Sequence, residues 1–401
     1  MNLLIVSVDA LPRLGGISLM AHHLANALVT QHGHQVVMLG PSGSAVPREY
    51  LHRYRLLEDV DSRVEERAGR AGLVQDARIR ALVEATVGRN GIDRVLLLHP
   101  FYYGVGTLEA CRQRGIPCSV YLHGFELRSQ MVRRGWEQAV AAREALKPDT
   151  LQRRLLHTIM TADEVLVNSR YTASLLEGLA PPERVRITGC GIPAHELERE
   201  LQLSPSHDPV QRAARRERFG LGPGPCVGFV GRHVAAKRVE RLLGMCAACP
   251  ELSALIVGSG PRESSARGHA RAWGLEGRVR LLGEVSDSAK WAALRAVDFL
   301  CLLSESNERT GQVEGFGIAL LEGAAAGAVP VSSGTGGMGD VVEHRVNGII
   351  VPPWDADAGQ LLAGLAGDVP AMKELVAAAR AQLTERFTWE AVAGGILEGW
   401  S

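Results

Sequence analysis

Residues 225–260 read PCVGFVGRHVAAKRVERLLGMCAACPELSALIVGSG, and this stretch decides the fold class. Two short apolar runs, CVGFV and ALIV, flank a longer helical pattern, and a glycine-containing loop follows each run. Apolar runs of this length that alternate with helices are typical of parallel strands covered on both faces. Ligands of such sheets bind at the carboxyl ends of the strands, so the loops after the two runs are candidate binding loops.

The same alternation continues on both sides of this stretch. Downstream runs are RVRLLGEV, DFLCLLS, AVPVSS and GIIVPP, and upstream runs are LLIVSV, HQVVMLG, RVLLLH, PCSVYLH, EVLVNS and RVRITGCGI. Residues 195–218 are polar, contain prolines and show no strand pattern, so we interpret them as the interdomain connection. The sequence therefore predicts an α/β fold with two Rossmann-like doubly wound domains facing each other across a cleft. We assign residues 1–200 to the first domain and 207–384 to the second, and expect residues 385–401 to pack back on the first.

Composition narrows the class of protein. Of the 401 residues, 46% are apolar and the formal net charge is +0, which excludes a disordered chain and gives no global attraction to nucleic acid. The cysteines are scattered, as in a reducing compartment, and the amino-terminal run reads as a buried strand rather than a signal peptide. No apolar run reaches the roughly 18 residues of a membrane span. We expect a cytoplasmic protein. Its arginine-rich segment from Arg128 to Arg154 could touch an anionic membrane but is better interpreted as a solvated helix.

The stretch EGFGIALLE, from Glu314 to Glu322, is the most informative loop. Its glycines, Gly315 and Gly317, precede a helical run, and the free N–H groups at a helix N-terminus suit a phosphate. Glu322 is the only charged residue from Gly315 to Gly339, on a helix that is apolar nearly all round and therefore buried. A buried carboxylate needs donors, either ligand hydroxyls or a neighbouring arginine, and the sequence leaves both open.

The loop GRHVAAKR after the run CVGFV carries Gly231, Arg232 and Lys237. The chain uses arginine as its default cation, so a lysine in this loop is unusual. Together Arg232 and Lys237 could neutralise a diphosphate, since one cation–phosphate contact at about 4 Å contributes roughly 4 kcal/mol at an effective dielectric of about 20 before desolvation. The alternative is a solvated basic loop.

Two further loops are candidates. GSGP, which contains Gly258 and Gly260, follows the run ALIV and is either a phosphate-binding turn or a plain tight turn. HGFE, from His123 to Glu126, follows the run CSVYL in the first domain. We expect a histidine at a strand end beside glycine to point toward a ligand rather than into the core.

Two other patterns are rejected as cofactor sites. GTGGMG, from Gly334 to Gly339, matches a dinucleotide fingerprint, but too little sequence follows for the rest of a dinucleotide fold, so we expect no NAD. The D-x-D triplets Asp59–Asp61 and Asp355–Asp357 lie in contexts typical of surface acids. We therefore predict no metal and no cofactor.

Taken together, these loops resemble those of the family 4 glycosyltransferases, which have the GT-B fold. The resemblance covers almost the whole chain and is strongest from Val227 to Pro352. The E-x7-E pattern of the family corresponds to Glu314 and Glu322, and its G-R-x4-K loop corresponds to Gly231, Arg232 and Lys237. Its G-x-G-P turn corresponds to Gly258–Pro261, and its H-G-x-E loop corresponds to His123–Glu126. Its first-domain glycine loop corresponds to Gly15 and Gly16.

The resemblance implies a retaining, metal-independent hexosyltransferase. Its co-substrate would be a UDP- or GDP-sugar, and its acceptor a saccharide, a lipid-linked molecule or a small molecule. Arg232 and Lys237 would bind the donor diphosphate and Glu322 the ribose hydroxyls. Glu314 would contact the transferred sugar, and His123 would lie near the reacting centre. The other implied donor contacts are Gly15, Gly16, Gly231, Gly258, Gly260, Gly315, Phe316, Gly317 and Ile318.

Two alternatives remain open. One is another GT-B enzyme, such as a sugar-nucleotide epimerase or a glycan phosphorylase, and the other is an inactive nucleotide-sugar-binding protein. The chain departs from the family pattern at Arg238, where glycine is common, and at Asp340, where glutamate is usual.

Overall fold

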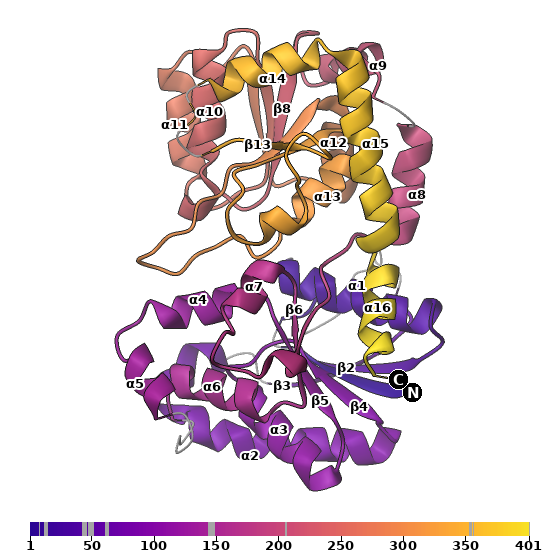
Figure 1. The fold of residues 1–401 in the computed structure, drawn as a ribbon, viewed down its shortest axis with the longest axis vertical. Helices are drawn as coiled ribbons and strands as arrows, with labels where there is room; N and C mark the ends of the chain where they lie inside the picture. Colours follow the sequence, from indigo (N-terminus) through magenta and orange to yellow (C-terminus); the bar gives the residue numbers. More distant parts are fainter. Residues whose placement is uncertain are drawn as a thin grey trace. The chain divides into compact units, whose positions relative to one another are not determined.

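The chain folds into two compact units, each with its own parallel sheet (Figure 1). The computed structural model describes residues 1–7, 9–11, 15–41, 46, 52–60, 64–142, 149–204, 207–352, 355 and 357–400, without the side chains of 58–60 and 64–75. Unit 1 comprises Met1–Cys190, Glu308–Gly311 and Trp389–Ser401, and unit 2 comprises Gly191–Asn307 and Gln312–Thr388.

Unit 1 is built on a seven-stranded sheet with the order β3-β2-β1-β4-β5-β6-β7, in which every neighbouring pair is parallel. Its strands are β1 (Asn2–Val6), β2 (Gln35–Pro41), β3 (Arg55–Val60), β4 (Arg94–Leu97), β5 (Cys118–Leu122), β6 (Glu164–Val167) and β7 (Val185–Ile187). Its helices are α1 (Gly16–Thr30), α2 (Val64–Asn90), α3 (Gly104–Arg114), α4 (Phe125–Met131), α5 (Trp136–Ala141), α6 (Leu151–Thr161), α7 (Arg170–Ser174), the short η2 (Pro182–Arg184) and α16 (Trp389–Glu398).

Continuous apolar runs form these strands because both faces of the sheet are covered. In β1, Leu4 and Val6 share a core with Ile79 and Val83 of α2. Leu3 and Ile5 alternate with them, so they point to the opposite face, and they are buried as well. Figure 1 shows α2 and α3 on one face of the sheet and α1 on the other.

The carboxyl-terminal segment belongs to unit 1, where α16 packs against α1. Trp400 donates its indole N–H to Glu164 at 2.9 Å, and its ring lies under the guanidinium of Arg94, 4.9 Å from the ring centroid. The chain therefore returns to the first sheet after completing the second.

Unit 2 is built on a six-stranded sheet with the order β10-β9-β8-β11-β12-β13, again with parallel neighbours. Its strands are β8 (Cys226–Val230), β9 (Ser253–Val257), β10 (Val279–Gly283), β11 (Phe299–Leu302), β12 (Val329–Ser332) and β13 (Ile349–Ile350). Its helices are α8 (Ala194–Leu203), α9 (Pro209–Glu217), η3 (Ala235–Lys237), α10 (Val239–Ala248), α11 (Glu263–Ala272), α12 (Asp287–Ala296), α13 (Ile318–Ala325), η4 (Gly336–Asp340), α14 (Ala358–Ala366) and α15 (Val369–Arg386).

The polar segment 195–218 is a packed part of unit 2 rather than a plain connection. It forms α8 and α9, which contact α13 and α12. Arg216 of α9 is buried and binds Asp298 at 2.7 Å, and the same carboxylate oxygen accepts the N–H of Cys226 at 2.8 Å. The high charge of this segment reflects buried ion pairs, which sequence periodicity does not reveal. The unit boundary falls at Cys190, whereas the sequence placed the end of the first domain at residue 200.

The arginine-rich segment from Arg128 to Arg154 is not uniformly solvated. Arg154 is buried in unit 1, where it binds Asp76 of α2 and donates to the carbonyl of Phe101 at 2.7 Å. The expectation of a solvated helix is therefore wrong for Arg154, because a long-range carboxylate neutralises its charge. Arg133 and Arg134 are exposed, and residues 143–148 lie outside the described part of the chain.

Candidate functional site

The glycines of the two loops after β8 and β9 allow these loops to pack backbone against backbone. Gly231 donates its N–H to Val257 at 3.1 Å, and His233 donates to Ser259 at 2.8 Å. A Cβ at Gly258 would lie 2.0 Å from the carbonyl oxygen of Gly231, and one at Gly260 would lie 2.8 Å from that of His233. Both glycines of GSGP are therefore required by this close approach, and the loop that carries Arg232 and Lys237 is held by its neighbour.

Lys237 and Glu314 come together at the carboxyl edge of the second sheet, although the two residues are far apart in the sequence. Lys237 lies in η3, and its Nζ forms an ion pair with Oε2 of Glu314, which precedes α13. Ser304, in the loop after β11, also donates to this oxygen at 3.4 Å. Both side chains of the ion pair are largely buried. Arg232 is exposed in the same loop.

The residue after Lys237 shows why glycine is common at that position. Arg238 has φ of 50°, in the left-handed region that favours glycine. Its guanidinium binds Glu305 at 3.0 Å, as does that of Arg241. The departure from the family pattern is therefore accommodated without changing the turn.

Glu322 has a protein partner, but it is a lysine and not an arginine. Lys290 of α12 binds Oε1 of Glu322 at 2.8 Å and Asp287 at 2.7 Å. Burial lowers the pKa of Lys290, but the carboxylates of Glu322 and Asp287 raise it by more, so its pKa is above the usual value. The sequence-based reasoning missed Lys290, although the rarity of lysine that singled out Lys237 applies to it equally.

A third acid, Glu196, interacts with this cluster. The pKa of Glu196 is raised to about 7, first by burial and then by repulsion from Asp287 and Glu322, while the attraction of Lys290 opposes the shift. Glu196 lies in α8, within the segment that the sequence suggested was only a connection. Three carboxylates therefore surround one lysine beside α13.

The glycine loop before α13 packs on the loop after β12. Gly317 caps α13 with φ of 100°, and the helix begins at Ile318. Gly337 donates its N–H to the carbonyl of Glu314 at 2.9 Å, and a Cβ at Gly336 would lie 2.3 Å from that oxygen. Residues 334–339 thus support the Glu314 loop. Phe316 is buried against Phe387, with ring centroids 5.4 Å apart, so only its backbone is available to a ligand.

In unit 1, the candidate residues lie where strands end and α1 begins. Gly15 precedes α1, where its N–H donates to Oγ of Ser18 at 3.0 Å, and Gly16 is the first residue of that helix. His123 follows β5 directly, and its N–H donates to Oε2 of Glu126 at 3.1 Å. The carbonyl of His123 accepts a bond of 3.2 Å from Asn168, which follows β6.

His99 is a second histidine at this edge, and the sequence-based reasoning missed it. It follows β4, the strand that pairs with β5, and its ring stacks on Tyr102 with centroids 5.8 Å apart. The pKa of His99 is lowered to about 3, first by burial and then by repulsion from His123. Nδ1 of His99, Nε2 of His123 and Oε1 of Glu126 are buried without a hydrogen-bond partner among the described residues. The signal was available, because RVLLLH ends in histidine just as CSVYLH does.

The fold and these loops define a class of protein, and comparisons with known families give the same class. A model described as Glycosyltransferase Family 4 matches residues 14–196, and one described as Glycosyl transferases group 1 matches residues 211–378. The chain belongs to the group 1, family 4 glycosyltransferases, and its two parallel-sheet domains form the GT-B fold.

Individual relatives give more detail. The chain is 33% identical over 244 residues to the phosphatidyl-myo-inositol mannosyltransferase of Mycobacterium leprae, a match to 56% of this chain and 62% of that protein. It is 26% identical over 399 residues to the GDP-mannose-dependent monoacylated alpha-(1-6)-phosphatidylinositol monomannoside mannosyltransferase of Corynebacterium glutamicum, covering 96% of this chain and 94% of that one. The chain thus matches less than two thirds of the length of the Mycobacterium leprae protein but nearly all of the Corynebacterium glutamicum protein.

Solved structures agree on the fold. The crystal structure of HepE from Anabaena in complex with UDP superposes with a TM-score of 0.75 at 18% identity, covering 100% of this chain and 99% of that one.

Two predictions from the sequence concern membranes and metals. None of the helices in the described ranges is long and apolar enough to cross a bilayer. The described side chains also contain no group of three or more histidines, cysteines or acids that could hold a metal ion. The triplet Asp59–Asp61 lies outside the residues whose side chains are described.

Proposed function

We propose that the protein transfers a hexosyl group from a nucleotide sugar to an acceptor hydroxyl with retention of configuration. We further propose GDP-mannose as the donor and an inositol-containing lipid as the acceptor, since the relatives described above are named for these substrates. The observation that supports the donor assignment is the convergence of Lys237, Glu314 and the glycine-capped start of α13 at one sheet edge.

The donor diphosphate would bind Arg232, Lys237 and the N–H groups at the start of α13. Because Glu314 already neutralises Lys237, binding exchanges one anion for another at the lysine. The gain there is smaller than the roughly 4 kcal/mol of an isolated cation–phosphate contact at an effective dielectric of about 20. Arg232 is exposed and forms no ion pair with a described acid, so its contact with the phosphate would add directly to donor affinity. The contact of Lys237 with the phosphate would in addition release Glu314 from its ion pair.

Glu314, once released from Lys237, would accept hydrogen bonds from hydroxyl groups of the transferred sugar. Glu322 accepts a hydrogen bond from Lys290 through Oε1, which leaves Oε2 for hydrogen bonds from the ribose hydroxyls. The leaving phosphate would take the acceptor's proton, so catalysis rests on positioning and on charge stabilisation of the departing diphosphate. The unpartnered ring nitrogens of His99 and His123 would contact hydroxyl groups of the sugar and the acceptor.

The test is turnover with radiolabelled GDP-mannose and with UDP-glucose, in the presence of vesicles that contain phosphatidylinositol. The expected result is a mannosylated lipid whose new linkage is α by NMR. Product with a β linkage would contradict retention. Epimerised donor without transfer, or a requirement for free phosphate without nucleotide, would favour the other GT-B enzymes. Donor binding by calorimetry with neither transfer nor slow donor hydrolysis would identify an inactive binding protein.

The cations provide a sharper test of the site. Arg232→Ala and Lys237→Ala should each weaken GDP binding by about 10- to 100-fold in calorimetry, the range expected for a charged hydrogen-bonding partner. Arg271→Ala, which removes an exposed arginine of α11, is the matched control and should bind GDP normally. Unchanged affinity in both loop variants would remove the diphosphate from this loop.

A further inference from the structure

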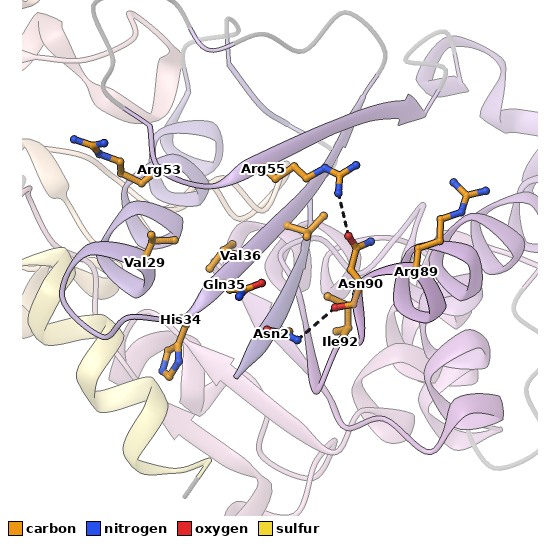
Figure 2. Close-up of a pocket in the computed structure, with 11 residues that line it drawn as sticks. Asn2, Val29, His34, Gln35, Val36, Arg53, Arg55, Arg89, Asn90 and Ile92 are labelled. Carbon is orange, nitrogen blue, oxygen red and sulfur yellow. Dashed lines mark hydrogen bonds between the residues drawn. The ribbon is translucent and has the colours of Figure 1, made fainter.

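A pocket of about 480 Å³ lies at the amino edge of the first sheet, at the opposite ends of the strands from the candidate site (Figure 2). Asn2 and Gln35, which begin β1 and β2, line it together with Arg53, Arg55, Arg89 and Asn90. Its volume is in the range of small-molecule sites, about 300–1,000 Å³. The family-based assignment gives this pocket no role.

The pocket is strongly cationic. Three of its described lining residues are arginines, and none of the described lining residues carries a carboxylate. Arg55 donates to the amide oxygen of Asn90 at 3.2 Å, while the side chains of Arg53, Arg55 and Arg89 form no ion pair with any described residue. Figure 2 shows Arg55 reaching toward Asn90, Arg89 extending from the end of α2, and Arg53 at the other end of the view.

Local structure gives only one of the three arginines, Arg89, a stabilising role. Arg89 lies in the last turn of α2, where a cation interacts favourably with the helix dipole. Arg53 and Arg55 come from the approach to β3 and its first residue, where no helix end requires them. Elsewhere in the chain arginines meet acids, as Arg154 meets Asp76 and Arg216 meets Asp298. Among the residues whose side chains the structure describes, the arginines of the pocket therefore lack the acidic partner that Arg154 and Arg216 have.

We propose that this pocket binds the phosphate group of a phosphomonoester or diphosphate ligand. Guanidinium groups bind phosphate oxygens through paired N–H donors, and the amides of Asn2, Gln35 and Asn90 supply further polar contacts. Valines and Ile92 form the apolar part of the wall, where the body of a small ligand or a headgroup would lie. The phosphate belongs either to a soluble metabolite or to a lipid headgroup.

The site is separate from the candidate donor and acceptor site. Gly16 begins α1 at the carboxyl edge of the sheet, whereas Val29, near the other end of that helix, lines the pocket. At 1.5 Å per residue these positions are roughly 20 Å apart. One small ligand cannot occupy both, so the pocket serves as an effector site or as an anchor, and its occupancy does not depend on the proposed transferase activity.

Calorimetry with pyrophosphate at physiological ionic strength tests the proposal on the whole protein. Wild type should bind one pyrophosphate at this pocket, and the double variant Arg55→Gln/Arg89→Gln should bind it at least about tenfold more weakly. The matched control is Arg78→Gln/Arg112→Gln, which removes two exposed arginines of α2 and α3 in the same unit. It should retain wild-type affinity, with GDP present throughout to saturate the donor loops.

Vesicles distinguish the two sources of phosphate. Flotation with vesicles that carry phosphatidylinositol 4-phosphate, but not with phosphatidylcholine alone, and loss of flotation in the double variant would assign a lipid headgroup. Binding of pyrophosphate without flotation would assign a soluble ligand. The proposal is overturned if neither probe binds, or if the control loses binding as much as the double variant. Arg53→Gln provides an independent variant, and circular dichroism with thermal melting checks that every variant is folded.

Discussion

The polar groups at the carboxyl edges of the two sheets differ in whether they have a protein partner. In unit 2 the charges are already paired, Lys237 with Glu314 and Lys290 with Glu322. In unit 1, Nδ1 of His99, Nε2 of His123 and Oε1 of Glu126 are buried and have no hydrogen-bond partner among the described residues. A paired edge can exchange its internal anion for a phosphate, whereas unpaired imidazole nitrogens suit hydroxyl groups. In the proposed function, the edge of unit 2 would bind the charged donor and the edge of unit 1 would contact hydroxyl groups of the sugar or the acceptor.

The largest expected effect comes from breaking the charged edge. Glu314→Ala should reduce transfer by about 10²–10³, as loss of one preorganised contact to a transition state does. GDP affinity should stay the same or increase, because Lys237 then has no competing anion. Product assays and calorimetry on the same preparations measure both quantities. Glu343→Ala, an exposed acid of the same unit, is the control. Wild-type transfer in Glu314→Ala would remove this residue from the site.

Substitutions at the carboxyl edge of the first sheet should have a different effect. His123→Ala should lower kcat by about 100-fold and His99→Ala by about tenfold, the lower range for a side chain that contacts reacting groups. Neither change should alter GDP affinity, since the side chains proposed to bind the nucleotide, Arg232, Lys237 and Glu322, belong to unit 2. Steady-state kinetics with varied acceptor, next to GDP calorimetry, gives the comparison. His52→Ala, an exposed histidine of unit 1, should behave as wild type. A loss of GDP binding in His99→Ala would contradict the division between the two edges.

Lys290 tests whether the second ion pair holds the charged edge together. Lys290→Met leaves Glu322 and Asp287 without their cation, and we expect the free energy of unfolding to fall by about 1–2 kcal/mol. This is less than the 3–5 kcal/mol of a fully buried pair, because both side chains keep some exposure. Urea denaturation measures the change. The double variant Lys290→Met/Glu322→Gln should recover part of the loss. If the double variant is less stable than Lys290→Met, the contribution of Lys290 to stability does not come from its ion pair with Glu322.

The smallest effect concerns pH. The pKa of Glu196 is raised from 4.5 to about 7 in the folded protein, first by burial, so the folded state binds more protons than the unfolded state between these pH values. Stability from this group is therefore present at low pH and is lost as the pH rises from about 4.5 to 7. Glu196→Gln should be more stable than wild type at pH 8 by about 1–2 kcal/mol, with a smaller difference at pH 5. Equal differences at both pH values in urea denaturation would contradict the shifted pKa.

Sequence reasoning succeeded where the signal is local. The alternation of apolar runs predicted two parallel sheets, because a strand buried on both faces must be apolar at consecutive positions. It also identified the loops at the carboxyl edges, since each loop follows its strand directly. It failed for residues 195–218, where α8 and α9 were interpreted as a connection, and for the buried Arg154. In both places the burial depends on partners that are distant in the sequence, such as Asp298 and Asp76.

By itself, the sequence determined the fold class, the family and the loops at the carboxyl edges of the sheets, because hydrophobic period, glycine position and short motifs are properties of neighbouring residues. Only the tertiary structure decided which charges meet: Lys237 with Glu314, Lys290 with Glu322, and three arginines around a pocket whose described lining contains no acid. Charge pairing depends on distances of a few ångströms between side chains, and chain topology sets those distances for residues that are far apart in the sequence.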